Sequence, residues 1–188
     1  MVRRRPGLAA VGLLAALLIG VALGRSTVPA PRVEAARVLE EQVLPLVGDA
    51  DGIWTASSGD RPPVSEALVA LRRDHDVTGV QVGGDAWLSA YDSVLARLAG
   101  LDLPAEARPV QRQFIAAVAL SRDAVEVMIR AAGLEPGDAR RDLMTEVGRL
   151  RTRSEQMTQS ARASVDDLGG KRSGVAPLSP VTPFEEGR

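Results

Sequence analysis

Two long segments with helical apolar spacing, residues 105–132 and 138–168, constrain the fold of this chain more than any other feature. Within each, apolar or small residues recur at alternating steps of four and three, the spacing of one helix face that packs against another helix. These residues are Val110, Phe114, Ala117, Ser121, Ala124, Met128 and Ala131 in the first segment, and Leu143, Val147, Leu150, Ser154, Met157, Ala161, Ser164 and Leu168 in the second. Only five residues, Gly133 to Gly137, separate the segments, so we expect an antiparallel helical hairpin.

The second of these segments is the more polar. Its packing face holds Ser154, Ala161 and Ser164 at positions where larger apolar side chains would bury more surface. We therefore expect packing to weaken along this helix, and its last half to project beyond the core or to fray.

Three shorter helices are expected before the hairpin. Apolar spacing predicts helices over 33–44, 64–74 and 86–99, with Pro45 ending the first and Asp85 capping the last. The segments 48–63 and 76–84 are rich in turn residues and are expected to be irregular or briefly extended. Aromatic residues make up only 3% of the chain, which argues against a β-sandwich or barrel. The predicted fold class is all-α, with an antiparallel four- to five-helix bundle over residues 33–168.

The N-terminal region has the pattern of a membrane-spanning helix. Residues 7–24 carry no charge and follow Arg3, Arg4 and Arg5, and Arg25 comes directly after them. A helix of this length spans about 27 Å, close to the thickness of a bilayer core. The basic cluster predicts that residues 1–6 stay in the cytoplasm and that the body lies outside. The lipid bilayer is thus an expected partner, through residues 7–24.

A cleaved signal peptide is the alternative interpretation of the same segment. Such a peptide has a shorter apolar stretch and small residues at its cleavage site, and the best candidate site is Ala22-Leu23-Gly24. In one case the body is anchored to the cytoplasmic membrane by a single span, and in the other it is secreted. Both interpretations place the body outside the cytoplasm.

Small residues recur every four positions along the apolar segment, at Gly12, Ala16, Gly20 and Gly24. A stripe of this kind lets two membrane helices approach closely, so it is a candidate packing face for a homodimer. The alternative is compositional, because glycine and alanine are common in membrane helices and the predominance of arginine over lysine is typical of a GC-rich bacterial genome.

Two segments flank the expected bundle. Residues 25–32 contain two prolines and are expected to form an extended linker. Residues 169–188 are rich in glycine, proline and serine and are expected to be disordered. Prolines in this tail keep a three-residue period, so a polyproline II ligand is the other interpretation.

The charge of the chain is unevenly distributed. The net charge is −1, from 23 basic and 24 acidic residues. Removing the four arginines around the apolar segment leaves 19 basic against 24 acidic residues, a net charge of −5 for the rest. An acidic body argues against a nucleic-acid partner. The chain has no cysteine and one histidine, which excludes disulfides, thiolate metal sites and multi-histidine metal sites, and no cofactor is expected.

The sequence is compatible with three functions. The first is a non-enzymatic, membrane-tethered interaction or scaffold module that binds a protein partner or an envelope component. The second is an exported small-ligand binder with an apolar pocket around Trp54, Trp87 and Tyr91. The third is an enzyme that uses carboxylates or His75, for which the sequence offers no catalytic motif.

Overall fold

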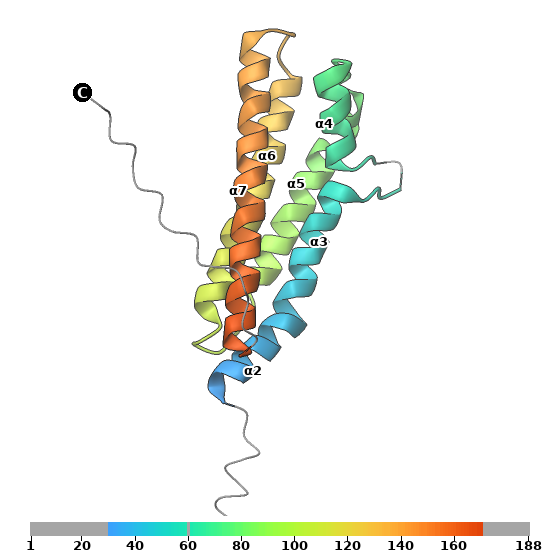
Figure 1. Cartoon of the computed structure of the whole chain (residues 1–188). Coiled ribbons are helices and arrows are strands. Elements are labelled where there is room, and N and C mark those ends of the chain that lie inside the picture. Colours follow the sequence, from blue (N-terminus) through green and yellow to red (C-terminus); the bar gives the residue numbers. More distant parts are fainter. Residues whose placement is uncertain (1–29, 60, 171–188) are drawn as a thin grey trace, which may run out of the picture.

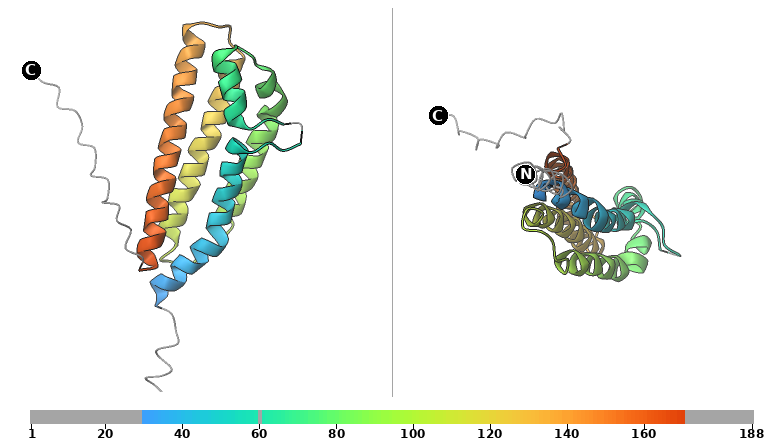
Figure 2. Two further views of the ribbon diagram at one scale, coloured as in Figure 1. Left: turned by 45° about the vertical axis from the view of Figure 1, so that its right-hand side comes forward. Right: turned by 90° about the horizontal axis from the view of Figure 1, so that it is seen from below.

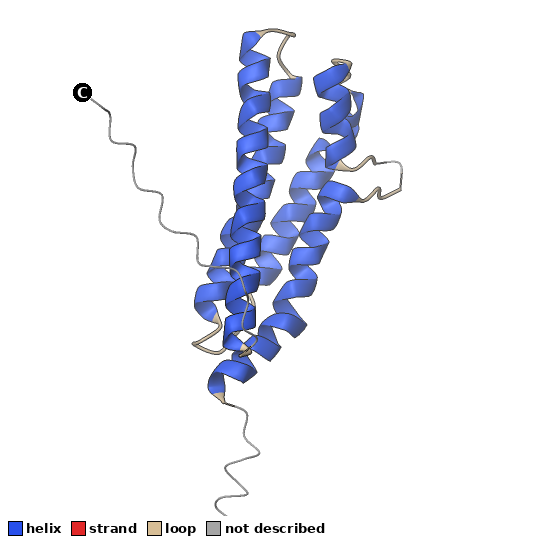
Figure 3. Ribbon diagram, in the orientation of Figure 1, coloured by secondary structure: helices blue, strands red, loops and turns tan. Residues whose placement is uncertain are grey.

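The protein is all-α over the part that the structure describes, which comprises residues 30–59 and 61–170 of a computed structural model (Figure 3). The elements are α2 (Pro31–Val38), a π-helical stretch η1 (Leu39–Val43), α3 (Leu44–Thr55), α4 (Val64–Arg73), α5 (Thr78–Ala99), α6 (Arg108–Ala132) and α7 (Asp138–Leu168). No helix among the described residues is both long enough and apolar enough to cross a membrane. The expected membrane segment 7–24 lies outside the described residues.

The helices form an up-and-down antiparallel bundle (Figure 1). The first run of helix, α2, η1 and α3, rises from the lower end of the bundle, and α4 continues upward after the loop 56–63. The next three helices, α5, α6 and α7, then run down, up and down, and α6 and α7 lie side by side over most of their length (Figure 2). The lower end of α7 meets α2, and the upper end of α7 lies beside the upper end of α4.

The sequence predicted that the first helix ends at Pro45, and this prediction is wrong. The helix continues from Pro31 to Thr55, and the widened π turn immediately before Pro45 is the reason. In that turn the N–H of Leu44 bonds to the carbonyl of Leu39, five residues back. A wider turn leaves room for the proline ring, which in a regular α-helix would clash with the carbonyl four residues earlier.

The segment 76–84, predicted to be irregular, is also mostly helical. Helix α5 begins at Thr78, so Asp85 lies inside it and is not its N-cap. The carboxylate of Asp76 accepts the N–H of Thr78 at 2.8 Å instead, and hydrogen bonding to the side chain and the backbone of Thr78 lowers the pKa of Asp76. The glycines are needed for close packing, because a Cβ on Gly83 would lie 2.3 Å from the Trp87 ring and one on Gly84 would lie 3.2 Å from Ile129.

The hairpin of α6 and α7 confirms the predicted heptad-like pattern fully on α6 and in part on α7. Every residue of the predicted stripe on α6 is buried. On α7, Val147, Ser154 and Ala161 are buried, whereas the other five residues of the stripe are half-buried. The expected fraying of α7 is wrong, since the helix continues to Leu168 and packs against α2 near its end. Val165 is 2% exposed there. The second half of α7 is serine-rich toward α6, and it is therefore α2 that buries its apolar residues.

One of the four sides of the bundle is open. Helix α7 packs along α6 and against α2, but it does not pack along α3 or α4. In a closed four-helix bundle the first and last helices would also be neighbours. Here the side between α3–α4 and α7, which we call the open side, carries two grooves, and these form the candidate functional site.

Candidate functional site

Two grooves lie along the open side of the bundle, one below the other. The lower groove has a volume of about 260 Å³ and runs between α3 and α7 over α6; its lining residues are Val47, Ala50, Asp51, Val118, Ser121, Arg151, Ser154, Glu155, Thr158, Gln159 and Arg162. The upper groove has a volume of about 440 Å³ and runs between the upper ends of α4 and α7; its lining residues are Leu71, Arg72, His75, Pro136, Gly137, Arg140, Arg141, Met144 and Thr145.

Arg151 on α7 is the main link across the open side. Its Nη2 lies 2.9 Å from a carboxylate oxygen of Asp51 on α3, and its Nε lies 2.7 Å from Glu155 one turn along α7. The guanidinium also lies over the ring of Trp54, 4.7 Å from its centroid. A cation over an indole is attracted by the negative face of the ring. Arg151 therefore joins α3 to α7 at the upper end of the lower groove.

A chain of hydrogen bonds forms the floor of the lower groove. Ser154 Oγ donates to the carbonyl of Ala117 at 2.7 Å, so its lone pairs are left to accept from Ser121 Oγ, also at 2.7 Å. Arg151 Nη1 donates to Ser121 Oγ at 3.3 Å. Both serines are almost fully buried. The chain satisfies two hydroxyls inside the α6–α7 interface and connects them to the charged edge of the groove.

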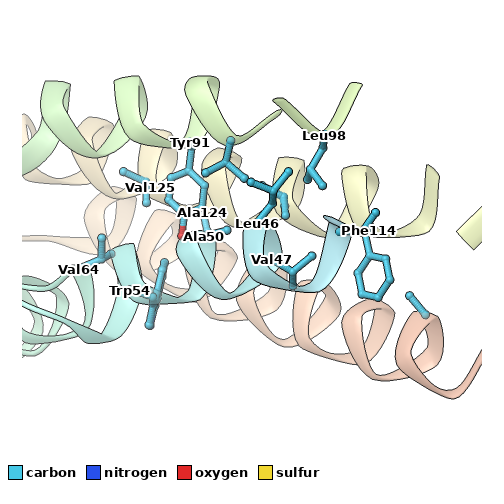
Figure 4. Close-up of a cluster of buried hydrophobic side chains, with 14 of the residues drawn as sticks. Leu46, Val47, Ala50, Trp54, Val64, Tyr91, Leu98, Phe114, Ala124 and Val125 are labelled. Carbon is cyan, nitrogen blue, oxygen red and sulfur yellow. The ribbon is translucent and has the colours of Figure 1, made fainter. Parts of the chain in front are cut away.

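The three predicted ligand-pocket residues, Trp54, Trp87 and Tyr91, do not line a common pocket. Figure 4 shows Tyr91 extending from α5 toward α3, while Trp54 extends from α3 on the side away from α5. Trp87 and Tyr91 are fully buried in the core, and neither lines the two grooves. Trp54 is 7% exposed and borders the lower groove through its contact with Arg151. Trp54 thus borders the open side, the Tyr91 hydroxyl lies behind the lower groove near Arg151 and Asp51, and Trp87 belongs to the core alone.

The hydroxyl of Tyr91 is buried without a hydrogen-bond partner among the described residues. Burial raises the pKa of this phenol to about 12, with Arg151 opposing the shift and Asp51 adding to it. An ionised phenolate would have to be accommodated in a largely apolar core, which disfavours it.

Tyr91 should therefore titrate about two pH units above a free tyrosine, whose pKa is about 10. Since it is the chain's only tyrosine, tyrosinate absorbance reports it alone. Below pH about 10 the phenol is neutral in both folded and unfolded chains. Above that pH the unfolded chain ionises first, so stability should fall as pH rises toward 12. Unfolding in denaturant should restore a midpoint near 10, and Tyr91→Phe should remove both the signal and this part of the pH dependence. A native midpoint near 10 would contradict the buried placement.

The upper groove contains the chain's only histidine. His75 follows α4 and adopts a left-handed backbone conformation, with φ of 57°. Its neighbours in the groove are Arg72, Arg140 and Arg141, and none of the lining residues in the described part is acidic. Carboxylates that could orient the imidazole as a general base do not line this groove, and the surroundings favour an anion instead.

The remaining predicted sites fall on residues 1–29. The topology residues Arg3, Arg4, Arg5 and Arg25, and the packing stripe Gly12, Ala16, Gly20 and Gly24, lie outside the described residues. In the sequence, Arg140 and Arg151 belong to a run of arginines on 138–168 that nearby acidic residues offset, and nothing there distinguishes them as site residues. The burial of Arg140 could have been predicted, because it precedes Val147 by one heptad and so falls on the buried stripe of α7. The ion pair of Arg151 could not have been predicted, since its partner Asp51 is 100 residues away.

Within residues 30–59 and 61–170, no group of three or more histidine, cysteine or acidic residues is arranged to hold a metal ion. No family model, curated protein or solved structure matches this chain.

Proposed function

We propose that this protein is a non-enzymatic interaction module, tethered to the cytoplasmic membrane through residues 7–24, with its helical bundle outside the cytoplasm. The observation that carries the proposal is the open side of the bundle. Helix α7, 31 residues long, makes no extended backbone contact with α3 or α4, and its side chain Arg151 reaches across to α3. A partner protein's helix would insert side chains into the lower groove, as in other helix-in-groove complexes.

The composition of the lower groove supports binding of a protein segment. Beside the buried serines, its floor includes the apolar residues Val47, Ala50 and Val118, each no more than 5% exposed, and its edge carries Thr158 and Arg162. An apolar centre with a polar edge is the usual arrangement of a protein interface. Arg151 and Trp54, stacked at the upper end, are of the residue types that contribute most to binding energy in interfaces.

The expected topology fits this use of the open side. The described part of the chain starts at the lower end of the bundle, where α2 begins, and the open side runs along the length of the bundle (Figure 1). A bundle held at its lower end would therefore leave the lower groove facing sideways, accessible to a partner in the same compartment.

The topology can be tested by labelling single cysteines, because the natural chain has none. Thr152, exposed on α7, and Val2, before the apolar segment, provide a matched pair of sites. We expect a membrane-impermeant maleimide to label Thr152→Cys in intact spheroplasts and Val2→Cys only after permeabilisation. The reverse pattern would refute the proposed orientation. The intact mass of the membrane-bound protein then shows whether residues 1–24 are retained.

The role of the groove can be tested with a photo-crosslinking amino acid in place of a threonine of α7. Thr158 lines the lower groove, whereas Thr152 lies six residues earlier, about 1.7 turns, and so on a different face of the helix. In cells, we expect a discrete crosslinked product from position 158 and none from position 152. Arg151→Ala, which removes the link to Asp51 and the stack on Trp54, should reduce the yield at 158. Equal products at both positions, or none at 158, would refute a docking role for the groove.

A further inference from the structure

From the upper groove we infer a second site, independent of the proposed docking function, that binds a phosphate group carried on a partly apolar molecule. The charged residues that line this groove are all basic: Arg72, His75, Arg140 and Arg141. By contrast, Asp51 and Glu155 balance the arginines of the lower groove. The bundle body is acidic as a whole, so this concentration of positive charge is local.

Arg140 carries the inference. It is 7% exposed, and its Nε and Nη1 are buried without a hydrogen-bond partner among the described residues. Its remaining nitrogen, Nη2, donates to the carbonyl of Leu134, and no carboxylate within residues 30–59 or 61–170 forms an ion pair with it. A buried guanidinium without a counter-charge is costly to the folded state. Its position in the wall of the groove suggests that the missing partner is a bound anion.

The start of α7 adds further donors to the same place. Pro136 and Gly137, which precede the helix, line the groove, and no side chain caps the first turn. The first N–H groups of a 31-residue helix therefore lack helical partners and lie at its positive end, the arrangement that favours phosphate. Asp138, in the first turn, does not supply the missing counter-charge of Arg140, because its carboxylate is exposed and pairs with Arg141.

The rest of the upper groove has room and apolar surface for a larger ligand than inorganic phosphate. Leu71, Pro136 and Met144 contribute apolar surface, and the volume of about 440 Å³ exceeds what one phosphate group fills. A phosphate attached to an apolar or aromatic body matches both features. Two sources share this chemistry, a soluble organophosphate and a phospholipid headgroup.

Position in the bundle favours the soluble source. Helix α7 starts at the upper groove and ends against α2, so the groove lies about 45 Å from the end where α2 begins. If the chain is tethered at that end, the groove is held well away from the membrane that anchors it.

The test measures calorimetric binding of two probes to the full chain purified in detergent. The probes are phenyl phosphate and, below its micelle concentration, dihexanoyl phosphatidylglycerol, with sodium chloride at matched ionic strength as the control. We expect phenyl phosphate to bind with one site per chain. Binding of the lipid instead, if lost on mutation of Arg140, would also support the phosphate site but assign it to a headgroup. Heats equal to those of chloride for both probes would overturn the inference.

Variants separate a ligand site from a structural role. Arg140→Met should weaken phenyl phosphate binding at least about tenfold, the loss expected for a charge-assisted contact. It should leave the Tm of the ligand-free protein unchanged or higher, because it removes a buried unpaired charge. Arg72→Gln, at an exposed position that should not affect folding, should weaken binding by a smaller factor. Arg153→Met, exposed on α7 away from the groove, should change nothing. Binding that survives Arg140→Met and Arg72→Gln would refute the site.

Discussion

Replacing Trp87 with alanine is expected to lower the free energy of unfolding by about 3–5 kcal/mol. The Trp87 side chain is 1% exposed and lies against α5's own preceding turn at Gly83. The loss combines the transfer of a large apolar surface to water with the cavity that remains. Chemical denaturation of the wild-type and variant chains measures the difference directly.

The same ring explains why Gly83 is a glycine, and a double-mutant cycle can test that explanation. A Cβ at position 83 would lie 2.3 Å from the Trp87 ring, so Gly83→Ala should cost about 1–3 kcal/mol through strain. In the Trp87→Ala background the same change should become neutral or stabilising, because alanine favours helix over glycine by about 1 kcal/mol. Gly148→Ala in α7, where nothing beyond the helix's own adjacent backbone lies within 4 Å of the added methyl group, is the control and should stabilise the protein. Additive effects of the two substitutions would contradict the contact.

The buried serines of the α6–α7 interface give the second large effect. Ser154→Ala should destabilise the protein by about 1–3 kcal/mol, because it leaves the Ser121 hydroxyl without its acceptor inside the interface. Ser121→Ala should cost less, since Ser154 keeps its hydrogen bond to the carbonyl of Ala117, and Arg151, which loses a 3.3 Å contact, keeps its ion pairs with Asp51 and Glu155. The order of the two effects follows from the direction of the hydrogen bonds, and denaturation of both variants measures it.

Two further variants define how the serine pair acts. The double variant Ser121→Ala, Ser154→Ala should be less destabilised than the sum of the single changes, because neither hydroxyl is left unpaired. Ser164→Ala is the control on the same helix, since its hydroxyl only bonds to the carbonyl of Ser160 one turn back. A larger loss from Ser121→Ala than from Ser154→Ala would show that the hydrogen bonds run differently.

The sequence predicted those parts of the fold where the residues that touch are visible as a periodic pattern. The heptad-like spacing identified the packing face of α6, part of that of α7 and the hairpin between them. The prediction was wrong where packing between distant segments overrides local preference. Gly83 and Gly84 suggested an irregular segment, yet they allow Trp87 and Ile129 to approach α5 closely.

The candidate site was less accessible to sequence reasoning than the core. A groove on the open side exists because two helices are not in close backbone contact, and a periodic pattern within one helix cannot show which other helices it fails to contact. The ion pair between Arg151 and Asp51 joins elements 100 residues apart in a chain with many arginines and acids. Only Arg140 departed from its local pattern in a way that a sequence alone can reveal, as a charged residue on an otherwise uncharged buried stripe.

The widened turn at Leu39–Val43 has a consequence beyond making room for Pro45. A π turn holds about one residue more than an α turn, and each helical residue turns the chain by about 100°. The turn therefore sets a rotational offset between α2, which packs on α7, and α3, which packs on α5. Deleting one residue there would bring both halves into a single phase and turn the buried alanines of α2 away from the end of α7. The first helix can thus pack against α7 with one half and against α5 with the other only because the buried faces of the two halves are rotated relative to each other.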